Sequence, residues 1–156
     1  MTDREWMQEA LKYAEMAKEM GEIPVGAVIV RDGVLLCGAH NLRETDRSAT
    51  AHAELLAIEE ACRLLGGWRL SGCTLYVTLE PCPMCAGAIV NSRVDRVVFG
   101  AKDPAAGCCG SVLNLNSYPF NHAFSLSGGV CETESLEILR CFFEETRRKK
   151  KDDVEQ

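Results

Sequence analysis

The segment Pro81-Cys82-Pro83-Met84-Cys85 lies at the centre of the structure that this sequence predicts. A residue before proline avoids helical geometry, whereas proline itself is well tolerated at the first position of a helix. We therefore expect a helix that begins at Pro83, with Cys82 at the N-cap and Cys85 one turn later. Two thiols placed in this way can bind one metal ion, and the positive end of the helix favours their thiolate forms.

A second motif, His52-Ala53-Glu54, lies upstream and supplies the groups that complete such a site. His52 would be a third ligand, and three protein ligands leave a tetrahedral zinc ion with one position open, as in catalytic zinc sites. Glu54 is placed to be a proton shuttle. Two residues span about 200° of a helix, so we expect that His52 and Glu54 do not both point squarely at the ion. Buried free thiols are the alternative interpretation.

The order His-x-Glu followed by Pro-Cys-x-x-Cys is the signature of zinc-dependent nucleobase deaminases. A lone Cys-x-x-Cys would be weak evidence, because redox pairs and chance matches share it. The proline before the first cysteine and the upstream His-x-Glu make the match specific. The sequence therefore predicts a catalytic zinc site.

Length and composition favour one globular domain. The chain has 156 residues, and we expect a single deaminase domain over residues 1–151 and a disordered tail over residues 152–156. Nine scattered cysteines without a signal-peptide pattern indicate reduced thiols in the cytoplasm. No apolar run approaches membrane-spanning length. The net charge of −6 argues against a general nucleic-acid coat but allows a local basic patch.

Hydrophobic periodicity predicts the elements of the first half of the chain. They are a helix over residues 3–20, strands over 25–30 and 34–37, a loop over 38–50, and a helix over 51–65. The dipeptide Asp32-Gly33 between the two strands is a hairpin signal. The apolar stripe of the second helix is expected at Leu55, Ile58, Cys62 and Leu65.

The second half begins with an alternating strand over residues 73–79, which runs directly into the cysteine motif. A helix to about Asn91 and a strand over residues 94–99 follow, so the two strands are expected to be parallel with a right-handed crossover. The metal site then lies at the carboxyl end of a strand, where α/β sheets usually bind ligands. Residues 100–122 are irregular, and Phe124 and Leu126 suggest a fifth strand.

The last helix is expected to begin near Thr133, with an apolar stripe at Leu136, Leu139 and Phe143 and with Phe142 beside it. The basic run from Arg147 to Lys151 follows. Cations at the end of a helix complement its dipole, and a solvated tail is one interpretation. A phosphate-binding patch beside aromatic rings is the other, and the sequence alone favours neither.

A family resemblance extends over nearly the whole chain. It rests on Ile23-Pro24-Val25-Gly26-Ala27-Val28, Asn41, His52-Ala53-Glu54, Leu79-Glu80-Pro81-Cys82-Pro83-Met84-Cys85, Phe99-Gly100-Ala101-Lys102-Asp103, Gly110-Ser111, Asn121-His122 and Phe142-Phe143. On these residues the chain resembles the bacterial-type tRNA-specific adenosine deaminases of the cytidine deaminase-like superfamily. The zinc motifs are shared across the superfamily, and the C-terminal third is what points to tRNA. One departure is Cys108-Cys109, where the family more often has Ala-Ala or Ala-Cys. We expect these cysteines to be small buried loop residues.

The resemblance implies a three-layer α/β/α fold with a five-stranded mixed sheet, assembled as a homodimer. It implies conversion of adenosine to inosine at the wobble position of an arginine tRNA, with the anticodon stem-loop as partner. Asn41 would hydrogen-bond the target nucleotide, and Ile23, Pro24 and Leu79 would line the base pocket. Asp103 would lie near the target ribose. The C-terminal helix, with Phe142, Phe143, Arg147 and Arg148, would contact the anticodon loop.

The implied mechanism uses one zinc ion in each subunit, held by His52, Cys82 and Cys85. Zinc-bound hydroxide would attack C6 of adenine while Glu54 moves the protons and ammonia leaves. Two alternatives stay open. A deaminase of a free base such as guanine or cytosine would share the zinc motifs. A zinc-stabilised binding module without turnover would need a fourth protein ligand, for example Cys108 or Cys109.

Overall fold

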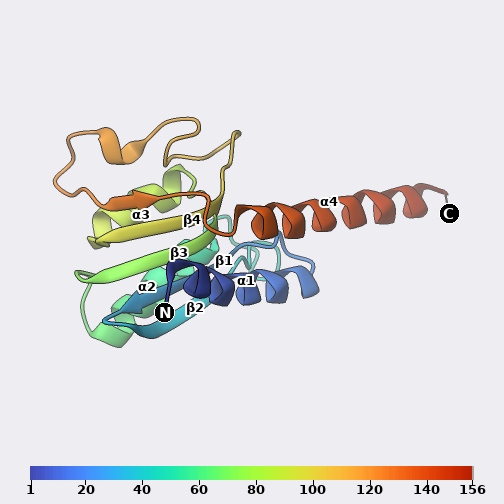
Figure 1. Cartoon of the computed structure of the whole chain (residues 1–156). Helices are drawn as coiled ribbons and strands as arrows, with labels where there is room; N and C mark the ends of the chain where they lie inside the picture. Colours follow the sequence, from blue (N-terminus) through green and yellow to red (C-terminus); the bar gives the residue numbers. More distant parts are fainter. Residues whose placement is uncertain (156) are drawn as a thin grey trace.

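The computed structural model describes residues 1–155, with side chains as far as Val154. The elements in chain order are α1 (Asp3–Glu19), β1 (Gly26–Arg31), β2 (Val34–His40), α2 (Ala53–Leu65), β3 (Cys73–Leu79), α3 (Pro83–Ser92), β4 (Arg96–Ala101), the 3₁₀ turn η1 (Leu115–Ser117), β5 (Ser125–Ser127) and α4 (Glu132–Glu155). Figure 1 shows the sheet with helices packed around it and α4 projecting away from it. In the described part of the chain, no helix is long and apolar enough to cross a membrane.

The sheet has five strands in the order β2-β1-β3-β4-β5. Strand β1 is antiparallel to both β2 and β3, whereas β3, β4 and β5 run parallel to one another. The hairpin between β1 and β2 turns at Asp32 and Gly33, whose φ angles are 52° and 73°. These positive angles at both central residues are those of the turn that Asp-Gly favours. The expected mixed sheet and hairpin are confirmed.

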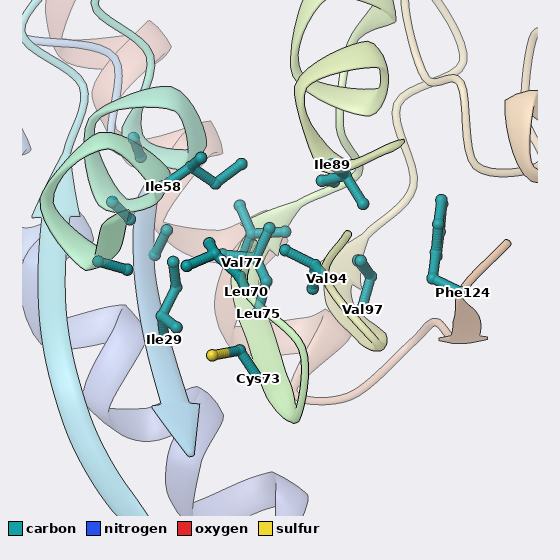
Figure 2. Packing of buried hydrophobic residues seen from close by; sticks show 14 of the residues in the cluster. Ile29, Ile58, Leu70, Cys73, Leu75, Val77, Ile89, Val94, Val97 and Phe124 are labelled. Carbon is teal, nitrogen blue, oxygen red and sulfur yellow. The ribbon is translucent and has the colours of Figure 1, made fainter. Parts of the chain in front are cut away.

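The alternation of side chains along the strands builds two separate cores, one on each face of the sheet. On one face, Ile29, Val77 and Val97 belong to the cluster that packs against α2 and α3, part of which is shown in Figure 2. On the other face, Val28 and Val98 pack with residues of α1 and with Cys131, just before α4. The sheet is therefore the middle layer of the expected α/β/α arrangement.

Two strands, β2 and β4, differ from the prediction by two or more residues at an end. Strand β2 continues past Cys37 to His40, because His40 and Ala39 pair with Gly26 and Ala27 at the start of β1. The longer strand carries the chain to Asn41 at the mouth of the candidate site. Strand β4 begins at Arg96, two residues later than expected, and ends at Ala101.

The predicted apolar stripe of α2 is only partly correct. Its buried residues are Ala53, Glu54, Ala57, Ile58 and Ala61, while Leu55, Cys62 and Leu65 are only half-buried. The three alanines have small side chains, which lets the helix backbone approach the sheet closely. The larger apolar side chains then lie along the flanks of the contact.

The predicted apolar stripe of α4 was wrong. Leu136 and Phe143 are 49% and 44% exposed, whereas Ile138 is 6% exposed and Phe142 is half-buried. The helix turns the face with Ser135, Ile138 and Phe142 inward because that face meets β4, β3 and α1. The helix also continues through Asp152 to Glu155, where we expected a disordered tail. Gln156 lies outside the described residues.

Candidate active site

Two helix N-termini meet beyond the carboxyl end of β3. Cys82 is the N-cap of α3, with extended backbone angles of −75° and 175°, and Pro83 occupies the first helical turn as predicted. His52 is the N-cap of α2, also in an extended conformation. Cys85 follows Cys82 by one turn and is fully buried. The local preferences of proline and of helix caps thus place three ligand-type side chains at one point.

The three side chains are spaced for a metal ion. Nδ1 of His52 lies 3.6 Å from Sγ of Cys82 and 3.7 Å from Sγ of Cys85. A tetrahedral zinc ion with bonds of about 2.3 Å to sulfur and about 2.0 Å to nitrogen separates such atoms by roughly 3.5 Å. All the ligand atoms of this group lie within 4.8 Å of one another. The donor set and its spacing therefore fit zinc.

The two thiols are electrostatically unequal. The hydrogen bond from Cys85, together with the backbone and His52, lowers the pKa of Cys82 to about 5 against the effect of burial. The same hydrogen bond and burial raise the pKa of Cys85. Cys82 is therefore the more easily ionised of the two thiols. Thiolate is the form that binds metal.

Glu54 lies in the first turn of α2 and is only 4% exposed. Burial raises the pKa of its carboxyl group to about 7, and the groups around it include both thiols and His52. The metal-binding group of His52, Cys82 and Cys85 does not include Glu54, in line with our expectation that His52 and Glu54 do not both point squarely at the ion. His52 itself precedes the first helical residue, Ala53, and has an extended backbone.

A cavity of about 220 Å³ opens directly above this group. Its lining consists of Ile23, Val25, Asn41, Arg43, His52, Ala53, Glu54, Leu79, Glu80, Cys82, Asp103 and Ala106. Four of the residues predicted for substrate binding are among them: Asn41, Ile23, Leu79 and Asp103. Pro24 is buried and is not part of the lining, where its neighbour Val25 stands instead.

Asn41 is 7% exposed and is fixed by two hydrogen bonds. Its Nδ2 donates to the carbonyl of Ile23, and its Oδ1 accepts from the backbone N–H of Arg43. An amide group has two donor hydrogens and two acceptor lone pairs, so one of each remains for a ligand. The side chain is therefore both held in place and still able to bind.

The sequence analysis missed two buried carboxylates: Glu80, which lines the cavity, and Glu22, which precedes the lining residue Ile23 in the sequence. Glu22 accepts hydrogen bonds from the backbone N–H groups of Glu44 and Thr45. Glu80 accepts from residues of the loop over positions 103–111. Burial alone would raise the pKa of each carboxyl, but these hydrogen bonds hold each pKa below its ordinary value. The donors are distant in sequence, so no local pattern identifies them.

Arg43 is a further lining residue that the sequence analysis missed. Its guanidinium is exposed and forms no ion pair with any described side chain. The only sequence signal was its position two residues after Asn41, in a loop predicted to be polar. An unpaired cation at the mouth of a cavity suits an anionic ligand.

The remaining predicted contact residues lie away from the cavity on α4. Phe142 and Phe143 form an edge-to-face pair with ring centroids 5.4 Å apart. Arg147 and Arg148 line a separate, shallow groove with Glu144 and Lys151. These four residues therefore belong to a second surface, which Figure 1 places on the projecting helix.

Cys108 and Cys109 are 2% and 4% exposed, in agreement with the prediction of small buried loop residues. Among the described residues, the metal-binding group consists of His52, Cys82 and Cys85 and includes neither of these cysteines. A fourth protein ligand from this loop, which a zinc-stabilised binding module requires, is therefore not in place. His52 and Cys82 of the metal-binding group are part of the cavity lining.

Comparison with known proteins agrees with this geometry. The family model for the cytidine and deoxycytidylate deaminase zinc-binding region matches residues 1–101. A tRNA-specific adenosine deaminase of Bacillus subtilis is 56% identical over 150 residues, which cover 96% of this chain and 93% of that protein.

Two solved structures are also similar. One comes from a study of A-to-I editing by tRNA:A34 deaminases at the wobble position of transfer RNA. It is 44% identical, has a TM-score of 0.84, and covers 86% of this chain and 99% of its own. A guanine deaminase from Bacillus subtilis is 40% identical with a TM-score of 0.63, and the match covers 65% of this chain and 66% of that one.

Proposed function

Since the chain belongs to the zinc-dependent cytidine and deoxycytidylate deaminase family, and within it to the tRNA-specific adenosine deaminases, we propose that it deaminates adenosine to inosine at the wobble position of a tRNA anticodon. The observation that carries this proposal is the extent of the match to a tRNA-specific adenosine deaminase, which includes the C-terminal third of the chain. The guanine deaminase matches over only about two thirds of this chain, with a lower TM-score.

In this proposal His52, Cys82 and Cys85 hold one zinc ion in each subunit. When bound, zinc supplies a Lewis acid that makes water a nucleophile near neutral pH. The extended N-caps His52 and Cys82 direct their side chains to the ion from two different helices. The ligands therefore depend on how α2 and α3 pack against the same face of the sheet.

Glu54 is the proposed proton shuttle. Its carboxylate accepts one proton from the attacking water and delivers it to N1 of adenine. It then takes the proton of the new hydroxyl group at C6 and passes it to the amino group, which leaves as ammonia while the C6 carbonyl forms. General acid–base catalysis of this kind contributes about 10²–10⁴-fold to the rate. The buried position beside the metal-binding group keeps the carboxylate within reach of both the water and the base.

The cavity walls bind the target nucleoside. Ile23, Pro24 and Leu79 provide the apolar surface around the base, with Pro24 supporting it from behind the lining. The free donor and acceptor of Asn41 hydrogen-bond the nucleotide, and Asp103 lies near the ribose. One oxygen of Asp103 already accepts from the N–H groups of Ala105 and Ala106, which leaves the other oxygen for substrate.

Helix α4 provides the proposed contact with the anticodon loop. Phe143 offers an exposed ring on which an unpaired base stacks, and the half-buried Phe142 supports that ring edge-to-face. Arg147 and Arg148 offer charges to phosphates. An anticodon loop is already single-stranded, so turning out a base costs less free energy than it does in a duplex. The Phe143 ring is 44% exposed, which supports a role in contact with a ligand.

The finer parts of the proposal follow the family resemblance. We propose that the substrate is an arginine tRNA, that residues 1–151 form one deaminase domain, and that the protein acts as a homodimer in the cytoplasm. All nine cysteines are free thiols, which supports a reducing compartment.

The test is deamination of a short RNA hairpin with an arginine anticodon loop, beside free adenosine, guanine and cytosine, with and without a chelator. We expect inosine in the hairpin and no product after chelation. Turnover of a free base with an untouched hairpin would overturn the proposed substrate while leaving the zinc site in place. Tightly held metal without any turnover would favour a binding module.

A further inference from the structure

Glu80 is a residue to which the proposed mechanism assigns no role. Its backbone N–H donates to the carbonyl of Ala101 at 2.8 Å, which continues the parallel pairing of β3 with β4 by one step. Glu80 is 2% exposed. It stands between the last residue of β3 and the Pro81-Cys82 turn.

The Glu80 carboxylate binds four donors of the loop over residues 103–111. Oε1 accepts from the backbone N–H of Asp103 at 3.1 Å and from the hydroxyl of Ser111. Oε2 accepts from the backbone N–H groups of Cys109 at 3.0 Å and Ser111 at 3.1 Å. No lysine, arginine or histidine among the described residues forms an ion pair with it. The buried charge is therefore satisfied by this loop alone.

The loop wraps tightly around this carboxylate at Gly107. A Cβ atom at position 107 would lie 2.3 Å from Oε2 of Glu80 and 2.6 Å from the carbonyl oxygen of Asp103. Neither group can move freely, because both are held by hydrogen bonds. Glycine is thus required here by the close approach between the loop and Glu80.

The same loop forms one wall of the cavity through Asp103 and Ala106. We propose that Glu80 is a positioning residue, which holds this wall of the cavity in the position needed to bind the target nucleoside. The inference rests on the proposed function, since it concerns binding at the same site. The metal-binding side chains stand at the N-termini of α2 and α3, and none of them belongs to the loop over residues 103–111. Substrate binding therefore depends on Glu80 more than metal binding does.

The variant Glu80→Gln tests this dependence with little change of volume. A glutamine amide has one acceptor oxygen, and its NH₂ group cannot accept from an N–H. The least unfavourable orientation puts NH₂ at the Oε1 position, where the Ser111 hydroxyl can rotate to accept. The backbone N–H of Asp103 then loses its partner. The substitution therefore loosens the cavity wall at Asp103.

We expect Glu80→Gln to raise KM for the RNA hairpin on the order of tenfold, the effect of losing one charge-assisted hydrogen bond. We expect kcat to change less than about twofold and bound zinc to stay at the wild-type level, because the groups that act on the base are untouched. Gly107→Ala disturbs the same contact without a change of charge and should raise KM similarly. Ser111→Ala keeps its backbone donor and should have a smaller effect. Glu60→Gln, on the outer side of α2, is the matched control.

Amide hydrogen exchange on the same variants reports on the loop without any substrate. We expect Glu80→Gln to accelerate exchange at Asp103, Cys109 and Ser111, while the amides of α2 keep wild-type protection. Unchanged exchange in the loop, or an unchanged KM, would overturn the inference. A parallel loss of kcat, zinc and thermal stability with no change in KM would mean that Glu80 only supports the fold. If the wild-type protein leaves the hairpin unmodified, the proposed function fails, and hydrogen exchange still decides the role of Glu80.

Discussion

Nδ1 of His52 lies 3.6 Å from Sγ of Cys82, although 30 residues separate the two in the sequence. Each residue is the N-cap of its own helix, and both helices pack on the same face of the sheet. The site therefore forms where the N-termini of α2 and α3 lie close together. Its geometry depends on the packing of α2 and α3 as much as on the ligands themselves.

Replacing a ligand should remove the metal. We expect Cys85→Ala to lose bound zinc and all deaminase activity, because two remaining ligands hold an ion far more weakly than three. Cys62→Ala is the matched control, since Cys62 is a half-buried thiol on α2 outside the metal-binding group. Zinc content by elemental analysis checks the prediction, and a Cys85→Ala variant with full zinc occupancy would contradict it.

Glu54→Gln should separate metal binding from turnover. We expect wild-type zinc content and a loss of about 10²–10⁴-fold in kcat, because an amide cannot carry the transferred proton. Paired measurements of zinc and inosine formation test this. Loss of zinc in this variant would show that Glu54 is a ligand.

The ion pair between Asp3 and Arg96 is expected to make a pH-dependent contribution to the stability of the fold. The Asp3 carboxylate accepts hydrogen bonds from Nη1 and Nη2 of Arg96, at 2.7 and 2.6 Å, and joins the start of α1 to β4. The hydrogen bond from Arg96 lowers the pKa of Asp3 below 3.8, so the pair stabilises the fold fully above that pH. The stabilisation is then lost as pH falls through the lowered pKa.

We expect Asp3→Asn to cost on the order of 1 kcal/mol at neutral pH, because solvent screens a pair whose side chains are 33% and 35% exposed. The difference from wild type should shrink once the pH drops below 3.8. Chemical denaturation over this range measures it. A difference that stays constant into strong acid would show that the carboxylate charge plays no part.

The cations of α4 are expected to bind phosphates. Reversing the charges of Arg147 and Arg148 should weaken hairpin binding and flatten its salt dependence, because fewer counterions are then released. Arg140→Gln is the control on the same helix, since Arg140 is already paired with Glu137 and Glu144. Binding titrations at several salt concentrations make the comparison. If the salt dependence of binding is unchanged in the Arg147 and Arg148 variant, this basic segment is only a solvated helix end.

The zinc-binding group was predictable because its placement follows from local preferences. Proline at position 83 sets the start of α3, and the cysteines then occupy known positions of a helix cap. The strand order was predictable in part for the same reason, since the hairpin and the parallel crossover are local rules. Features whose placement depends on neighbours in the sequence were therefore accessible to sequence reasoning.

The residues missed or misplaced depend on distant partners. Glu80 binds Ser111, which lies 31 residues away, and nothing near Glu80 in the sequence indicates a buried carboxylate. On α4, Leu136 and Phe143 form one apolar stripe, and Ile138 and Phe142 form another. The position of the helix against α1 and β4 decides which stripe is buried, and sequence periodicity does not contain that position.

The most direct test of the account is position-resolved detection of inosine in a hairpin whose anticodon loop carries adenosine at the wobble position and at one other loop position. We expect inosine at the wobble position alone, lost on chelation and in the Glu54→Gln variant. Inosine at both positions at equal rates, or none in the presence of bound zinc, would contradict the proposed function.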